Sequence, residues 1–191
     1  AIYLLMFFSS ILIIFSYLIS FSKDTDSNSN SVKQTVSEAF KEAVQNKNFN
    51  LLTLGFFVCG FHVTFIGTHF PAYLQDQDLG SIAGWSLALI GLFNIFGTLM
   101  YGYLGDRIAK KNLLVSIYTL RALVFLIFIF MPKTEFTVLF FAGTLGLLWL
   151  ATVPLTSGVI SDIFGSSFTS MLFGITLFSH NLGSVLGSWL G

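Results

Sequence analysis

Four strongly polar side chains lie within long apolar segments of this chain. His62, Asn94, Arg121 and His180 each fall near the midpoint of their own segment. Placing an arginine at the centre of a bilayer costs about 3 kcal/mol on insertion scales, so such residues are candidates for function. Polar side chains from different segments at one depth predict a site at the centre of a membrane-embedded structure.

The side-chain types suggest proton exchange and anion binding at that depth. Histidine has an unperturbed pKa of about 6.5, so His62 and His180 could exchange protons at working pH. The alternative for both is a neutral ring that hydrogen-bonds to a backbone carbonyl. The guanidinium of Arg121 can hold a carboxylate bidentately, and its alternative is a structural pair with an ion or a carbonyl. Both interpretations stay open at this point.

The segment 50–72 carries a stripe of small, polar and aromatic residues at three- and four-residue spacing, which places them on one helix face. Such a mixture suits the wall of a water-filled cavity. His69 lies near the end of the segment, just before Pro71, where an interfacial position is expected. The stripe consists of Gly55, Cys59, His62, Ile66, His69 and Tyr73.

Two later segments add candidate residues. Trp149, Thr152 and Thr156 are spaced to share a face, and Pro154 lies among them. A proline in a membrane span can free backbone carbonyls for a ligand or act as a flexing point; the alternative is a simple packing kink. Glycines recur every fourth residue near the end of the chain and predict a close-packing ridge. These are Gly183, Gly187 and Gly191.

The composition places all these residues in a membrane protein. Of the 191 residues, 54% are hydrophobic and only 9% are charged, whereas soluble domains carry about 25% charged residues. The single cysteine, Cys59, excludes a disulfide framework within the chain. No phosphate-binding loop, metal-ligand motif or nucleophile motif occurs. We therefore expect no enzymatic activity, no cofactor, no metal and no nucleic-acid partner.

Six segments are long enough to cross a hydrocarbon core of roughly 30 Å, which takes about 20 helical residues. They span 2–21, 50–72, 82–104, 113–131, 136–158 and 169–190. Helices are expected because backbone polar groups in lipid must be satisfied within the segment, and the runs do not alternate as barrel strands do. The predicted fold class is all-α integral membrane. Because the chain starts and stops inside apolar runs, we expect a piece of a longer protein.

Residues 22–48 interrupt this pattern with a polar linker and an amphipathic helix. Ser31 and Gln34 have the spacing of a capping box. This helix is expected to lie on the membrane surface, with a solvated connector as the alternative. Its apolar residues at helical spacing are Val32, Val36, Phe40 and Val44.

The distribution of Lys and Arg predicts the orientation. If the loop 22–48 is cytoplasmic, alternation places 105–112 and 159–168 on the same side. Only Lys133 then lies outside, in the short turn 132–135, and Arg121 lies within a span. The basic residues inside would be Lys23, Lys33, Lys41, Lys47, Arg107, Lys110 and Lys111.

The turn after the third segment reads Gly102-x-Leu104-x-Asp106-Arg107-x-x-Lys110-Lys111. It resembles the motif that major facilitator superfamily transporters carry between helices two and three, repeated less strictly between helices eight and nine. Ala109 stands where the family commonly has glycine. In the family, contacts of this motif stabilise one end state of an alternating-access cycle. We expect the glycine to allow close packing and the acid to face a neighbouring helix N-terminus.

The long polar loop implies which part of that fold is present, because the family has a long cytoplasmic connection between helices six and seven. Residues 1–21 then resemble helix six, 22–48 the central loop, and 49–191 helices seven to eleven of a twelve-helix fold. The stretches 69–74 and 164–165 resemble the bacterial branch related to monocarboxylate and oxalate–formate porters. In those branches the substrate arginine lies on helix eight, where this chain has Asn94. Arg121 would lie on helix nine, which tends to pack outside the central cavity.

The resemblance implies a secondary active transporter in the bacterial plasma membrane. Its substrate would be a small organic solute, with a monocarboxylate as the first candidate and proton coupling expected. Its partners would be the solute, protons, the lipid bilayer and the amino-terminal half of the same protein. Candidate residues for substrate binding or proton coupling are His62, Asn94, Arg121, Trp149, Thr152 and His180.

Two alternatives to this function stay open. The first is a drug or sugar exporter of the same fold, which an aromatic cavity without Arg121 would favour. The second is a non-transporting scaffold or receptor, in which protein partners would cap all the central polar groups.

Overall fold

A computed structural model describes residues 35–190 of the chain. The predicted helix at 2–21, the linker that follows it, the proposed cap at Ser31 and Gln34, and Gly191 lie outside the described residues. Those expectations therefore stay predictions.

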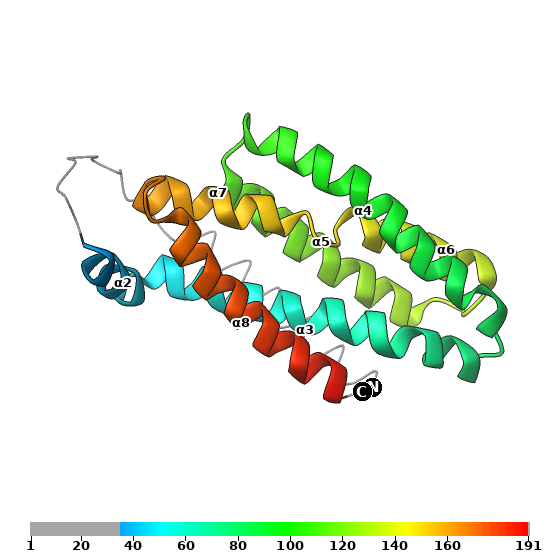
Figure 1. The fold of residues 1–191 in the computed structure, drawn as a ribbon. Helices are drawn as coiled ribbons and strands as arrows, with labels where there is room; N and C mark the ends of the chain where they lie inside the picture. Colours follow the sequence, from blue (N-terminus) through cyan, green and yellow to red (C-terminus); the bar gives the residue numbers. More distant parts are fainter. Residues whose placement is uncertain (1–34, 191) are drawn as a thin grey trace.

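The described part of the chain is entirely helical, as the composition predicts (Figure 1). A short helix, α2, precedes a long helix, α3, and a single 3-10 turn leads into α4. The remaining helices follow through short connections. Their bounds are α2 Val36–Gln45, α3 Lys47–Asp76, η1 Gly80–Ile82, α4 Ala83–Gly105, α5 Lys110–Phe130, α6 Glu135–Leu147, α7 Thr152–Phe164 and α8 Thr169–Trp189.

Four stretches of the described residues are long and apolar enough to cross a membrane: Lys47–Asp76, Gly80–Gly105, Lys110–Phe130 and Glu135–Phe164. The fourth stretch contains both α6 and α7. The predicted span at 169–190 is helical, as α8, but it is not among the four, because Ser, Thr, His and Asn interrupt its apolar residues. Large apolar side chains such as Trp85, Leu99 and Phe136 remain exposed, as expected where a helix faces lipid or another apolar surface.

Helix α2 has a well-defined start. Thr35 is its N-cap, and Thr35 and Glu38 form a capping box in which the Glu38 carboxylate accepts from the Thr35 amide at 2.7 Å. Donation from Thr35 to that carboxylate holds the pKa of Glu38 below its usual value. Val36, Phe40 and Val44 form an exposed apolar face, as the helical spacing predicts.

Two helix pairs form the framework of the bundle, and glycines let both pairs approach closely. Helix α8 packs along α3, where Gly183 and Gly187 lie against the backbone of Phe57 and Phe61. This confirms the predicted ridge for those two glycines. Helix α4 packs along α6, where Gly97 lies against the backbone of Leu147. A side chain at Gly97 or Gly183 would collide with a neighbouring main chain, which cannot give way as a flexible side chain can.

The predicted single span at 136–158 is interrupted between α6 and α7. Residues 148–151 form turns rather than α-helix (Figure 1). Pro154 lies in the first turn of α7, where its missing N–H needs no partner. The proline therefore marks the start of a second helix and not a kink inside one helix. We refer to residues 148–151 as the α6–α7 break.

Candidate functional site

The α6–α7 break lies beside Arg121, whose side chain is 1% exposed. One terminal nitrogen of its guanidinium donates to the carbonyl oxygens of Leu148 and, at 2.8 Å, Trp149. The other donates to the Cys59 sulfur at 3.2 Å. Arg121 therefore caps the carboxyl end of α6, where the helix dipole and the free carbonyls favour a cation.

Asn94 satisfies the other side of the same break. Its side-chain oxygen accepts from the Leu150 amide at 3.0 Å and from the Thr98 hydroxyl at 3.3 Å. The Leu150 amide lies just ahead of α7 and would otherwise lack an acceptor in its own helix. A side chain from α4 thus provides a cap to α7 that the local sequence does not.

Cys59 connects α3 to this centre. Its sulfur lies 3.5 Å from the Thr152 hydroxyl, in addition to the bond from Arg121. Groups from α3, α5 and α7 therefore meet at Cys59. The His180 ring lies 4.8 Å from the Phe56 ring, and both of its nitrogens are buried without a hydrogen-bond partner among the described residues. We call the set Cys59, Asn94, Arg121, Thr152 and His180, together with the break, the polar centre.

His62 lies one helical turn from Cys59 and is 1% exposed. Its ring centroid is 5.1 Å from that of Phe125 and 6.3 Å from that of Phe61. The face of α3 that was expected to line a water-filled cavity is therefore buried at His62. Trp149 contributes its carbonyl to the centre, while its side chain packs against the apolar cluster around Phe65 and Phe141.

Some buried polar atoms around the centre have no hydrogen-bond partner among the described residues. They include the Tyr118 hydroxyl, the Thr156 hydroxyl and the Nε of Arg121. The Tyr118 ring also lies 5.9 Å from the Arg121 guanidinium. Sequence reasoning did not select Tyr118, although its position one helical turn before Arg121 could have drawn attention to it.

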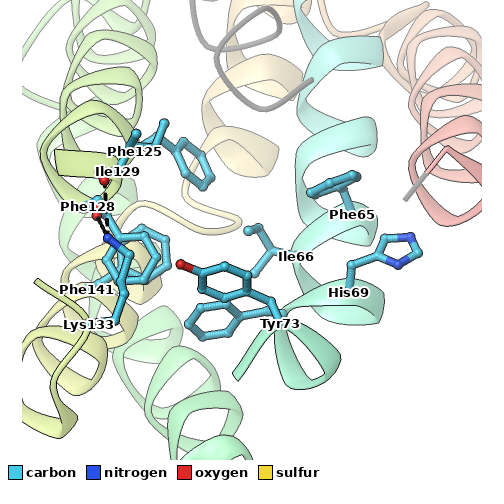
Figure 2. A pocket seen from close by; sticks show the side chains of 10 residues that line it. Phe65, Ile66, His69, Tyr73, Phe125, Phe128, Ile129, Lys133 and Phe141 are labelled. Atoms are coloured by element: carbon cyan, nitrogen blue, oxygen red, sulfur yellow. Dashed lines mark hydrogen bonds between the residues drawn. The ribbon is translucent and has the colours of Figure 1, made fainter. Parts of the chain in front are cut away.

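A concave region, which we call the outer pocket, lies between α3, α5 and α6 (Figure 2). Aromatic rings dominate its wall, and the rings of Phe128 and Phe141 stack with centroids 4.0 Å apart. The Tyr73 hydroxyl points across the pocket towards α5, whereas His69 turns away (Figure 2) and its Nε2 lies 3.2 Å from the Ser188 carbonyl oxygen. The lining residues are Phe65, Ile66, His69, Phe70, Tyr73, Phe125, Phe128, Ile129, Lys133 and Phe141.

Lys133 supplies a basic group at the outer pocket. Its amine donates to the carbonyls of Phe128 and Ile129 at 2.5 and 3.2 Å (Figure 2) and to that of Met131 at 2.6 Å. It also lies 4.6 Å from the Phe128 ring centre. Loss of hydration lowers the pKa of Lys133. This amine caps the end of α5, so the pocket is apolar with one cation at its edge.

The motif 102–111 covers the end of α4, the exposed turn 106–109 and the start of α5. Its Lys110 makes an ion pair of 2.9 Å with Asp162 near the end of α7, and Arg107 lies over the Tyr103 ring at 4.4 Å. Gly105 packs closely against the Leu155 side chain. At Gly102 none of the described residues lies close enough to contact an added side chain. Asp106 is exposed. The turn is therefore linked to the second half of the interrupted helix.

A comparison with protein families identifies the chain. A model of the Major Facilitator Superfamily matches residues 1–188. The chain belongs to the Major Facilitator Superfamily. This membership agrees with the all-helical architecture, the apolar spans and the motif at 102–111.

Two curated proteins are similar to this chain. One is an uncharacterized MFS-type transporter, YcxA, of Bacillus subtilis, at 28% identity over 152 residues, covering 77% of this chain and 37% of the relative. Another is a Na(+), Li(+), K(+)/H(+) antiporter of Planococcus maritimus, at 23% identity over 153 residues, covering 76% of this chain and 35% of the relative. The chain thus spans little more than a third of the length of these relatives. No solved structure matches it significantly.

Proposed function

We propose that this chain is the carboxy-terminal part of a secondary active transporter of the bacterial plasma membrane. In this proposal the protein moves a small organic solute by alternating access, coupled to protons. The domains are the predicted ones, with a cytoplasmic loop at 22–48, helices seven to eleven at 49–191, and the motif turn facing the cytoplasm. Membership of the superfamily supports the proposal.

The observation that carries it is the polar centre around an interrupted helix in the interior of an apolar bundle. Secondary transporters commonly place substrate and coupling sites near the bilayer midplane, at discontinuous helices. Here the break, a buried guanidinium and the candidate residues from four helices come together.

A small organic anion, first of all a monocarboxylate, is the proposed substrate class. Arg121 carries a permanent charge, and within the described residues no carboxylate pairs with it. The described helices carry Asp and Glu only towards their ends, at Asp76, Glu135 and Asp162, apart from the short α2. A metal cation would therefore find no carboxylate ligand at this depth, whereas an anion would find a cation.

His62 and His180 are the proposed proton-coupling residues. Both lie within or beside the polar centre, and both have rings that can exchange a proton. The antiporter from Planococcus maritimus, whose name includes proton exchange, makes a proton gradient the first driving force to test.

Uptake into proteoliposomes tests this proposal. The full-length protein would be supplied with radiolabelled monocarboxylates, sugars and alkali-metal ions, with and without an inward proton gradient. Gradient-driven uptake of an acid, reduced in Arg121→Gln and uncoupled from the gradient in His62→Gln or His180→Gln, is the expected result. Normal acid uptake in all three variants would overturn the assigned roles, and alkali-metal transport without acid transport would overturn the substrate class.

The outer pocket favours a second candidate function, export of an apolar aromatic solute. Its wall is aromatic and does not include Arg121, which is the property that distinguishes this alternative. Phe128→Ala and Tyr73→Ala would then reduce efflux of an aromatic dye while Arg121→Gln would not. The scaffold alternative has less support, because the Tyr118 hydroxyl and the Nε of Arg121 are buried without hydrogen-bond partners in the described part of the chain.

A further inference from the structure

The helices on the two sides of the α6–α7 break pack against different neighbours. Helix α6 packs mainly along α4, whereas α7 packs mainly against α5 and α8. At the break itself, Gly97 of α4 lies against the main chain of Leu147 at the end of α6. At the far end of α7, Asp162 is bound to Lys110 at the start of α5. The break therefore lies between an α4–α6 unit and an α5–α7 unit.

The two side chains that satisfy the break cross between these units. Arg121 belongs to α5 but binds the two carbonyls that directly follow α6, at Leu148 and Trp149. Asn94 belongs to α4 but binds the amide ahead of α7, at Leu150. Each residue thus holds the end of the helix that belongs to the other unit. Because neither bond is internal to a unit, a relative rotation of the two units would have to break or exchange both.

We infer that the α6–α7 break is a hinge, and that Arg121 and Asn94 form a latch that fixes the angle between its two halves. The backbone at 148–151 does not have the regular hydrogen bonds of an α-helix. A change of angle there therefore does not require a helix to unfold. Lipid offers no water to replace the latch bonds. The hinge can therefore change its angle only when other groups take the place of Arg121 and Asn94.

This inference rests on the proposed alternating-access function for its purpose, but its structural content is independent of substrate. The polar centre would be where ligand or proton binding acts on the hinge. There the Cys59 sulfur contacts both the Arg121 guanidinium and the Thr152 hydroxyl at the start of α7. In this arrangement Asn94 is a positioning residue, and Arg121 has a positioning role in addition to the anion-binding role proposed for it above. They act through the helix halves that they hold.

Hydrogen–deuterium exchange of the full-length protein in nanodiscs tests the latch without any transport measurement. Asn94→Leu removes the acceptor for the Leu150 amide, so exchange in a peptide that covers 148–153 should become about tenfold faster, the effect of losing one hydrogen bond. Asn94→Asp keeps an acceptor oxygen and should restore slow exchange. Thr144→Val removes a hydroxyl that bonds only within α6 and is the matched control.

Arg121→Met should give the same local increase, and peptides from the middle of α3 should stay protected in both variants. Unchanged exchange at 148–153 in both Asn94→Leu and Arg121→Met would overturn the latch. An increase spread over all the helices would also overturn it, because that would mean a general loss of packing. If Arg121→Met does not fold, the comparison of Asn94→Leu with Asn94→Asp still tests the latch, because equal exchange at 148–153 in these two variants would overturn it.

The two proposals can fail separately. Faster exchange at the break together with no uptake of any solute would leave the hinge standing and reject the transport proposal. Normal exchange in the variants together with gradient-driven uptake would reject the latch and keep the transporter.

Discussion

The α6–α7 break and the start of α2 both leave backbone groups outside a regular helix, but they satisfy these groups differently. At α2, Thr35 and Glu38 lie three positions apart and cap each other's backbone. At the break, Arg121 and Asn94 lie 27 and 56 positions from the groups that they bind. One site is exposed and local, whereas the other is buried and assembled from separate helices.

The difference follows from the supply of water. At an exposed helix end, water is the alternative partner, so a cap adds a modest stabilisation. Inside a bilayer no such alternative exists, and each unsatisfied backbone group costs several kcal/mol. A midmembrane break can therefore persist only where other helices supply side chains that reach it. Removing those side chains should cost more than removing a surface cap.

Arg121→Met should give the largest loss of stability. The substitution keeps an unbranched apolar stem but removes all the donors to Leu148, Trp149 and Cys59. Hydrogen bonds to charged groups are worth about 2 kcal/mol each, so we expect a loss of about 3 kcal/mol after partial relaxation. The midpoint of detergent-induced unfolding of the full-length protein measures it.

Arg121→Lys is the control for this change. It keeps the charge but not the planar fork, so it should recover only part of the loss. An unfolding midpoint for Arg121→Met equal to that of the wild type would contradict the central role of Arg121 at the break.

Cys59→Ala should have the next largest effect, about 1.5 kcal/mol. It removes the sulfur that accepts from Arg121 and that lies beside the Thr152 hydroxyl. Cys59→Ser supplies an oxygen in its place and should keep most of the stability. The same unfolding measurement, made on Arg121→Met with and without Cys59→Ala, should show that the two losses do not add. Additive losses would separate Cys59 from the polar centre.

The same contrast explains how much of the fold could be predicted from the sequence. Hydrophobic run lengths predicted helices that correspond to α3, α4, α5 and α8, and the superfamily match supports the resemblance seen in the motif at 102–111. Val36, Phe40 and Val44 predicted the exposed apolar face of α2. These signals lie in residues that are close in sequence, which is why they could be used.

The polar centre could be predicted only in part. The midspan depth selected Arg121 and Asn94, but no local pattern indicates that they bind the break, since their partners belong to other helices. Pro154 indicated an irregularity at 136–158 without showing that two separate helices result. Cys59 was placed on the expected cavity face, and only the packed structure brings it to Arg121. Long-range pairing depends on helix packing, which a single sequence does not specify.

Lys133→Met should have a smaller effect than either change at the polar centre, about 1 kcal/mol. The amine caps the last carbonyls of α5 from a neighbouring turn, and partial exposure lets water replace it. Lys133→Arg keeps a cation there and should stay close to the wild type. A loss of stability as large as that of Arg121→Met would mean that a partly exposed cap and a buried cap contribute equally.

Acidification should affect the start of α2 least of all. The bonds from Thr35 hold the pKa of Glu38 below its usual 4.5. A carboxyl with a depressed folded-state pKa stabilises the helix fully above its unfolded pKa, and this contribution is lost as the pH falls through the folded value. Lowering the pH from about 6 to about 3 should therefore loosen the first turn of α2 without disturbing the bundle.

A spin label at Ser37, introduced as Ser37→Cys in the Cys59→Ser background, would report this loosening as increased mobility at low pH. Glu38→Gln keeps a side-chain acceptor that does not titrate, so its label should show the same mobility across the range. An equal response in both proteins would assign the change to another group. If the label were instead as immobile at low pH as at neutral pH, the Glu38 carboxylate would contribute nothing to holding the first turn of α2, and the contrast between exposed and buried helix ends would have to rest on the break alone.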